Sequence, residues 1–252
     1  MTALSTPSER DLRRMLDVVS PEAATSGGSE FPEQVLRGLA ELIPCSAVSF
    51  LVMDPQRAET LCDQGLDLRQ FPYIDRAEDD ALFFKAYWDC LACSQPEVIH
   101  GPGVASQWLD HYTEREFGGL QMAEYHRMRG VWHELLVCLP SQHGLTRRVL
   151  LMRDAGDPPF TERDRLLLTL LRPHLAELRD RVEAERRDLP ALTPRQVELL
   201  RRLARGATNR QLARDLGLSE ATVRKHLENA YARLDVHSRT EALARVSSLL
   251  TA

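Results

Sequence analysis

The sequence predicts a two-part fold, an α+β domain built on an antiparallel sheet followed by an all-α domain of four helices. Two pairs of β-rich segments, each joined by a short polar turn, indicate two hairpins within the first 160 residues. Segments with helical periodicity precede, separate and follow these hairpins, an order typical of an antiparallel sheet covered by helices. After residue 190, short helical segments follow one another, separated by N-cap and glycine signals.

Two predicted helices precede the first hairpin. One begins at the N-cap Ser8, and a flexible hinge (ATSGGS) follows it. The second is expected to be capped by Ser29 and to end at Pro44. Residues 47–53 (AVSFLVM) are apolar and rich in β-forming side chains, and a turn (DPQRAE) leads from them into residues 59–62. These two segments predict the first hairpin.

The region between the hairpins is mostly helical in its pattern. Residues 77–92 carry apolar side chains at helical spacing and predict one helix, and residues 117–128 predict another. Residues 97–100 (EVIH) predict a short extended piece. The second hairpin pairs residues 131–139 (VWHELLVCL) with residues 145–153 (LTRRVLLMR), and it has the clearest hairpin pattern in the sequence.

A long helix is expected from the cap Thr161 to about residue 187, and Pro173 is expected to kink it. Its apolar residues recur at spacings of three and four, which is typical of a short coiled coil. Packing on the preceding domain explains the same pattern equally well. The residues in this stripe are Leu168, Leu171, Leu175, Leu178 and Val182.

Composition excludes several classes of protein. Hydrophobic residues make up 43% of the 252 residues and charged residues 27%, as in a folded globular chain rather than a disordered one. No apolar run approaches the roughly 18 residues that a membrane span needs. The N-terminus lacks the apolar core of a secretory signal. We therefore expect a cytoplasmic protein with no membrane partner.

The charge is divided unequally along the chain. Residues 190–252 hold 11 Lys and Arg against 6 Asp and Glu, and residues 1–189 hold 21 against 31, giving net charges of +5 and −10. A basic module has thus been joined to an acidic one. This asymmetry suits one domain that meets a polyanion and another that contacts something else.

The basic module centres on residues 209–226, which predict two short helices joined by a tight turn. Gly217 supplies the residue that can leave a helix with a positive φ, and Ser219 supplies the N-cap of the next helix. Ala213 is small enough to let the helices cross closely, and Val223 can pack back between them. This spacing predicts a helix-turn-helix.

The second helix of this motif carries side chains that suit a helix bound in a groove of DNA. Val223, Leu227 and Ala230 can face inward, which leaves the polar residues outside. Arginine and lysine suit guanine edges and phosphates, and asparagine suits adenine or phosphate. The polar residues of its first turns are Thr222, Arg224, Lys225, His226, Glu228 and Asn229.

Residues 192–242, from LTPRQ to RTEA, resemble the LuxR-type helix-turn-helix of bacterial transcription factors nearly throughout. The resemblance implies four helices, of which the third enters the major groove and the fourth is a dimer surface. It implies contacts of Arg224, Lys225 and Glu228 with base edges. It implies contacts with the DNA backbone by Thr208, Asn209, Arg210, Ser219, Thr222, His226 and Arg239.

Two positions depart from that family's pattern. Asp235 lies where the family has a glycine, so this turn must accept a left-handed conformation, which Asp tolerates better than most residues. Ala230 replaces a larger aliphatic residue, which predicts a looser contact beneath the third helix. Capping boxes are expected at Thr193 with Gln196 and at Ser238 with Glu241. The last helix offers an apolar dimer face made of Leu243, Val246, Leu249 and Leu250.

The order of elements in the α+β part resembles the GAF/PAS class of sensory domains, and the whole chain resembles the GAF–LuxR architecture of actinobacterial regulators. Such domains enclose a pocket between the sheet and the helices on one face. Tyr87, Trp108 and His133 are the candidate ligand residues, although core packing explains these aromatic and histidine side chains as well. The expected segments are a helix and hinge at 1–28, a GAF-like sensory or dimerisation domain at 29–160, a linker helix at 161–189 and the DNA-binding domain at 190–252.

Cys90 and Cys93 form a CxxC pair, which is typical of a redox site or of half a zinc site. A full zinc site needs two more ligands, and His100 is the nearest candidate. Buried structural cysteines are the simpler interpretation. The sequence shows no phosphate-binding glycine loop, nucleophile elbow or paired metal-ligand motif, so we expect no cofactor and no catalytic site.

The leading hypothesis is a sequence-specific DNA-binding transcriptional regulator that acts as a homodimer on double-stranded promoter or operator DNA. RNA polymerase is a candidate second partner. The N-terminal domain would sense an unidentified small molecule or serve only for dimerisation. The alternatives are a redox or metal sensor that uses Cys90 and Cys93, and a thiol-dependent enzyme with an accessory DNA-binding domain.

Overall fold

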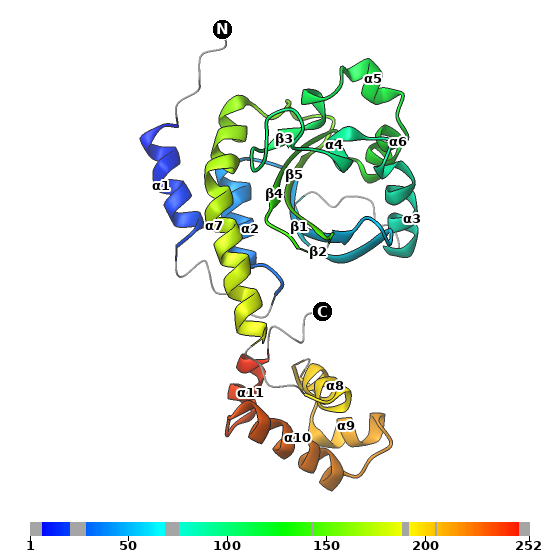
Figure 1. Cartoon of the computed structure of the whole chain (residues 1–252). Coiled ribbons are helices and arrows are strands. Elements are labelled where there is room, and N and C mark those ends of the chain that lie inside the picture. The colour runs from blue at the N-terminus through cyan, green and yellow to red at the C-terminus, as the bar shows by residue number, and fades with distance from the viewer. Residues whose placement is uncertain are drawn as a thin grey trace. The chain divides into compact units, whose positions relative to one another are not determined.

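A computed structural model describes residues 7–20, 29–68, 76–142, 144–187, 192–204 and 206–246. The described residues fall into two compact units, which are treated one at a time below (Figure 1). The first unit comprises the described residues up to 178, without 29–32, and the second comprises 29–32 and the described residues from 179 onward. The predicted hinge before residue 29 and the expected domain boundary at residues 189 and 190 lie outside the described residues.

A five-stranded antiparallel sheet forms the centre of the first unit, with strand order β2-β1-β5-β4-β3. Both predicted hairpins are confirmed. The first pairs β1 (Ala47–Asp54) with β2 (Glu59–Asp67), and the second pairs β4 (His133–Leu139) with β5 (Thr146–Arg153). The sheet is completed at the β4 edge by the short β3 (Ser106–Gln107).

Helices cover both faces of this sheet, so the predicted sheet covered by helices is confirmed (Figure 1). One face carries α1 (Glu9–Val18), α2 (Glu33–Leu42) and α7 (Glu162–Arg187). The other, concave face carries the helices that lie between the two hairpins in the chain. These are α3 (Arg76–Tyr87), α4 (Leu91–Ser94), the 3-10 helix η1 (Trp108–Asp110), α5 (Glu114–Gly118) and α6 (Gln121–Arg129).

Four local predictions are wrong. The single helix expected at 117–128 is interrupted, because α5 ends at Gly118 and α6 begins at Gln121. The single helix expected at 77–92 breaks after Tyr87, and Cys90 begins the separate turn α4. Residues 97–100 form turns rather than an extended piece, because the N–H groups of Val98 and Gly101 donate to nearby carbonyls of Gln95 and Glu97. Ser29 does not cap α2: its hydroxyl donates to the carbonyl of Phe31, and the helix begins at residue 33.

The leucine stripe of α7 is buried within the chain itself. Leu168 and Leu175 have no exposed surface, and Leu171 is 1% exposed. Of the two explanations left open by the sequence, packing on the preceding domain is therefore favoured over a coiled coil with a second chain. The helix begins as predicted at Thr161, whose hydroxyl accepts the N–H of Asp164, and it is one continuous helix through Pro173.

A buried arginine connects β5 to the distant loop before β1 and to the nearby loop that leads into α7. The guanidinium of Arg153 donates to the carbonyls of Pro44, Pro158 and Pro159 at 2.9–3.1 Å. It also lies 4.0 Å from the ring centroid of Phe160 and pairs with Asp164 at the start of α7. Because each bond compensates part of the cost of burying this charge, Arg153 can hold the end of the sheet against these loops.

The second unit contains four consecutive helices around a core of its own, as predicted. They are α8 (Pro194–Ala204), α9 (Asn209–Asp215), α10 (Glu220–Leu234) and α11 (Arg239–Arg245). Val246, expected on a dimer face, is instead fully buried in this core, and Leu243 packs against it. Leu249 and Leu250 lie outside the described residues. In the described part of the chain, no helix combines the length and apolar character required to span a membrane.

Candidate DNA-reading surface and ligand cavities

Hydrogen bonds at the helix ends fix the turn between α9 and α10. Thr208 begins α9 with a reciprocal capping box to Gln211. Gly217 then adopts a φ of +62°, in the left-handed region that favours glycine. The Ser219 hydroxyl accepts the Thr222 N–H at 3.0 Å and begins α10. The predicted helix, glycine turn and capped helix are therefore present, and they determine which side of α10 is free.

The two faces of α10 differ as the sequence predicts. Val223, Leu227 and Ala230 are buried, and Leu234 extends this row. Ala230 has no exposed surface, so the small side chain is enclosed by the core. The opposite side carries exposed polar side chains at spacings of three and four, which place them on one helix face. The exposed polar residues of α10 include Thr222, Arg224, Lys225, Glu228 and Asn229, and His226 is half-buried.

Contacts within the second unit affect two of the expected DNA contacts. Lys225 lies 3.9 Å from the Glu228 carboxylate, and both side chains are mostly exposed. A pair at this exposure is weak, so Lys225 can exchange it for another acceptor. Arg239 donates to the Leu203 carbonyl at 2.8 Å, which uses one of its N–H groups and positions the rest. Thr208, Arg210 and Ser219 are exposed, and Asn209 is half-buried.

The end of α10 has the backbone predicted for it. Asp235 adopts φ 53° and ψ 50°, the left-handed conformation for which a glycine is the ordinary choice. Its N–H donates to the Ala232 carbonyl, and the next N–H, of Val236, donates to the Tyr231 carbonyl. Thr193 and Gln196 form the predicted capping box of α8. Ser238 caps α11, but Glu241 accepts from the His237 N–H rather than completing the reciprocal bond.

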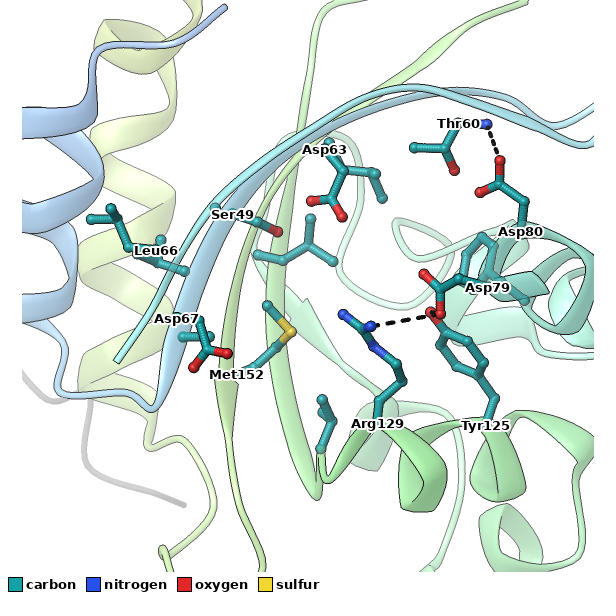
Figure 2. A pocket seen from close by; sticks show the side chains of 17 residues that line it. Ser49, Thr60, Asp63, Leu66, Asp67, Asp79, Asp80, Tyr125, Arg129 and Met152 are labelled. Carbon is teal, nitrogen blue, oxygen red and sulfur yellow. Dashed lines mark hydrogen bonds and ion pairs between the residues drawn. The ribbon is translucent and has the colours of Figure 1, made fainter. Parts of the chain in front are cut away.

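The first unit has a cavity of about 230 Å³ between the concave face of the sheet and helices α3 and α6 (Figure 2). Leu51, Phe83, Leu150 and Met152 contribute apolar wall, whereas four aspartates and one arginine contribute charge. The charged lining residues are Asp63, Asp67, Asp79, Asp80 and Arg129. The cavity therefore combines an apolar wall with many hydrogen-bond acceptors.

Hydrogen bonds and an ion pair already connect several of these polar lining residues. Tyr125 donates its hydroxyl to Asp79 at 3.1 Å, and Arg129 lies 3.7 Å from the same carboxylate (Figure 2). Asp80 accepts the backbone N–H of Thr60. Burial and the nearby Asp79 raise the pKa of Tyr125, so its hydroxyl stays protonated and can donate. None of these residues was among the ligand candidates of the sequence.

A second, smaller cavity of about 90 Å³ lies on the other side of α6. Trp108, Phe117 and Trp132 contribute aromatic wall, and His126 contributes the buried polar group. Burial lowers the pKa of His126 to about 4, so the ring is neutral near pH 7. Of the three ligand residues predicted from the sequence, only Trp108 lines one of these two cavities.

Tyr87 and His133 occupy other positions. Tyr87 is buried among Phe83, Phe84 and Trp88, and its hydroxyl accepts from Arg148 at 3.3 Å. His133 is also buried, with its ring parallel to that of Trp108 at a centroid distance of 6.4 Å. The structure therefore does not bring the three candidates together around one space. Alternation along a strand can assign a face, but it cannot show which residues of other elements reach it.

The CxxC pair is buried beside α4. Cys90 and Cys93 are 0% and 5% exposed, and neither takes part in a disulfide. The hydrogen bond between them lowers the pKa of Cys90 and, together with burial, raises that of Cys93. Among the described residues, no group of three or more His, Cys, Asp or Glu side chains is arranged to hold a metal ion.

Comparison with known proteins identifies the second unit. Residues 190–246 match the family described as bacterial regulatory proteins, luxR family. The C-terminal unit is therefore a LuxR-type helix-turn-helix domain. The chain is 39% identical over 100 residues to the monoamine regulon transcriptional regulator of Klebsiella aerogenes, covering 38% of this chain and 42% of that protein. It is 36% identical over 67 residues to the nitrate/nitrite response regulator protein NarL of Escherichia coli, covering 27% and 31%.

These matches span less than half the length of either relative. Both relatives are regulators rather than enzymes, so the thiol-dependent enzyme is not favoured. Among solved structures, Escherichia coli SdiA aligns over 96% of this chain and 98% of its own, with 16% identity and a TM-score of 0.40. A ligand-binding domain of VqsR from Pseudomonas aeruginosa aligns over 68% and 93%, with 16% identity and a TM-score of 0.42. Similarity at this level does not define a common fold.

Proposed function

We propose that the chain is a sequence-specific DNA-binding transcriptional regulator that acts as a homodimer on promoter or operator DNA. The observation that carries this proposal is the free polar face of α10, held outward by the buried row of Val223, Leu227 and Ala230. A helix of this kind fits the major groove, where arginine and lysine can reach guanine edges. The match of residues 190–246 to the LuxR-type domain supports the same function.

In this proposal, different side chains supply specificity and affinity. Arg224, Lys225 and Glu228 contact base edges, and Asn229 lies on the same exposed side of the helix. The residues assigned to the DNA backbone are Thr208, Asn209, Arg210, Ser219, Thr222, His226 and Arg239. Ser219 and Thr222 lie at the N-terminus of α10, where backbone N–H groups and the helix dipole favour a phosphate. RNA polymerase is a candidate further partner.

Two arginines make this assignment testable. Arg224→Ala should weaken binding to the preferred site by about 1–3 kcal/mol and relax the preference at one base position. Arg210→Ala should weaken binding to all sequences alike, because a phosphate contact carries no base information. Selection of binding sites from a randomised duplex pool would measure both effects. If Arg224→Ala retains the affinity and the base preference of the unmodified protein, the assignment of α10 is wrong.

For the first unit, we infer a small-molecule sensor that uses the cavity of Figure 2, in an arrangement like that of GAF/PAS domains. Its mixture of apolar wall and carboxylates suits a ligand that has hydrogen-bond donors beside an apolar part. Dimerisation alone is the competing role. Thermal unfolding against a panel of metabolites separates the two, since a ligand of the folded state raises Tm whereas a unit that only dimerises responds to protein concentration.

A further inference from the structure

The smaller cavity, which lies on the side of α6 away from the cavity of Figure 2, is lined by a buried histidine that has an unpaired ring nitrogen. His126 is 6% exposed, and its Nδ1 atom has no hydrogen-bond partner among the residues that the structure describes. Buried polar atoms in folded proteins are nearly always paired. His126 also lines the cavity, so a molecule inside it lies beside the imidazole ring.

Aromatic rings form the wall beside this histidine. Trp108 stacks on Phe117 with ring centroids 4.2 Å apart and an angle of 12° between the rings. The Phe117 ring meets the His126 ring edge-on, with a centroid distance of 5.4 Å. Trp108 is held in place by a hydrogen bond from its Nε1–H to the Trp132 carbonyl, 3.2 Å long. The wall is therefore fixed before any ligand arrives.

Size and polarity restrict what can enter. The cavity of about 90 Å³ is smaller than the roughly 150 Å³ that encloses a benzene ring, so nothing larger than a single ring fits. Ala123 and Val131 add apolar surface, and Trp132, which is 48% exposed, lies where the cavity meets solvent. The charged residues of the lining, Glu114 and Arg127, are exposed. The interior thus offers aromatic faces and one imidazole, and no buried charge.

We propose that this cavity is a binding site for a small planar aromatic molecule that carries a single O–H or N–H group, bound by aromatic contact with Trp108 and Phe117 and by a hydrogen bond to His126. Aromatic rings associate by stacking or edge contact at these distances, which explains the preference for a planar ligand. The hydrogen bond to His126 explains the preference for a ring with a polar hydrogen. The site is separate from the cavity of Figure 2, so it goes beyond the sensor proposed above.

Phenol and toluene are matched probes for this proposal, because they share a ring and differ in the hydroxyl group. The chain has three tryptophans, so Trp88→Phe leaves Trp108 and Trp132, and both of these line the cavity. Phenol added to the full-length Trp88→Phe protein should change the tryptophan fluorescence, and the change should reach a plateau as the phenol concentration rises. Tryptophan is excited at the long-wavelength edge of its absorption band, where phenol does not absorb. Toluene should bind at least several-fold more weakly, because it leaves the imidazole unpaired.

Two further variants in the same background identify the contacts. His126→Phe should weaken phenol binding about tenfold and leave toluene binding nearly unchanged, as expected for the loss of one buried hydrogen bond. Ala123→Leu should abolish binding of both probes by filling the cavity. Met128→Ala, an exposed change on the same helix, should leave both unchanged. Far-ultraviolet circular dichroism checks that each variant is folded.

The proposal is overturned if phenol gives no saturable change, if Ala123→Leu binds it as well as the parent, or if His126→Phe does not discriminate between the two probes. These outcomes concern the first unit alone. The DNA-binding proposal is measured by the Arg224 and Arg210 variants, so either can fail without the other.

Discussion

At the scale of single residues, His126 makes the folded state sensitive to acid. Its pKa is lowered to about 4 by burial, from an ordinary value of 6.5. The folded state therefore favours the neutral ring. The stability that His126 contributes is fully present above pH 6.5 and is lost as the pH falls toward 4.

A comparison of two proteins measures this effect. The lost contribution is on the order of 3 kcal/mol, because each pKa unit corresponds to about 1.4 kcal/mol. We expect the free energy of unfolding of the unmodified protein to fall more steeply between pH 6.5 and pH 4.5 than that of His126→Phe. Urea denaturation at a series of pH values supplies both curves, and parallel curves would contradict the prediction.

Asp235 shows how much one residue can reveal from sequence alone. Its position after a helix, where the family pattern has a glycine, predicts a left-handed backbone, and the structure has φ 53° there. Ser219 and Thr208 are similar cases, because the partner of an N-cap side chain lies only three residues away. His126 gives no such signal. Its environment comes from Trp108 and Phe117, which the chain brings to it from other elements.

At the scale of elements, α7 illustrates an ambiguity that only packing resolves. The same leucine spacing fits a coiled coil between two chains and a helix buried against its own domain. In the structure, Leu168, Leu171 and Leu175 are buried without a second chain. These three leucines are therefore part of the core of the first unit.

Two leucines of α7 provide a matched pair for this conclusion. Leu175→Ala should lower the free energy of unfolding by about 2–5 kcal/mol, because Leu175 has no exposed surface and its removal leaves a cavity. Leu170→Ala removes the same atoms from a side chain that is 42% exposed, and it should cost much less. Urea denaturation of dilute protein measures both. Equal losses of unfolding free energy in the two variants would favour the coiled coil. A loss in Leu175→Ala that depends on protein concentration would favour it as well.

The helix predicted at 77–92 failed for a related reason. Apolar spacing continues through Cys90 and Leu91, so the pattern contains no break. The structure ends α3 at Tyr87 and starts α4 at Leu91, which buries both cysteines of the pair. Burial of Cys90 and Cys93 depends on where the chain turns, and a periodic pattern cannot specify that turn.

At the scale of the whole molecule, the two parts of the chain differ in charge. Residues 190–252 carry +5 and residues 1–189 carry −10. We expect residues 190–252 alone to bind non-specific duplex DNA more tightly than the full chain at low salt, because the acidic part repels phosphate. The difference should shrink as salt rises, since ionic screening shortens the range of that repulsion. Fluorescence anisotropy of labelled duplex DNA at a series of salt concentrations measures the affinity of each protein. An affinity difference that does not depend on salt would exclude charge as the cause.

Local sequence signals are enough to predict the helix-turn-helix domain: its helix caps, the turn at Gly217, the buried row of α10 and the polar face opposite it. These features depend on residues a few positions apart, so local stereochemistry and helical periodicity are sufficient to predict them. The two hairpins were predictable for the same reason. Packing between distant parts of the chain decides that the stripe of α7 is buried, that Arg153 contacts the loop at Pro44, and where the two cavities lie. Those features arise from contacts between residues far apart in the chain, and no local pattern encodes which of them meet.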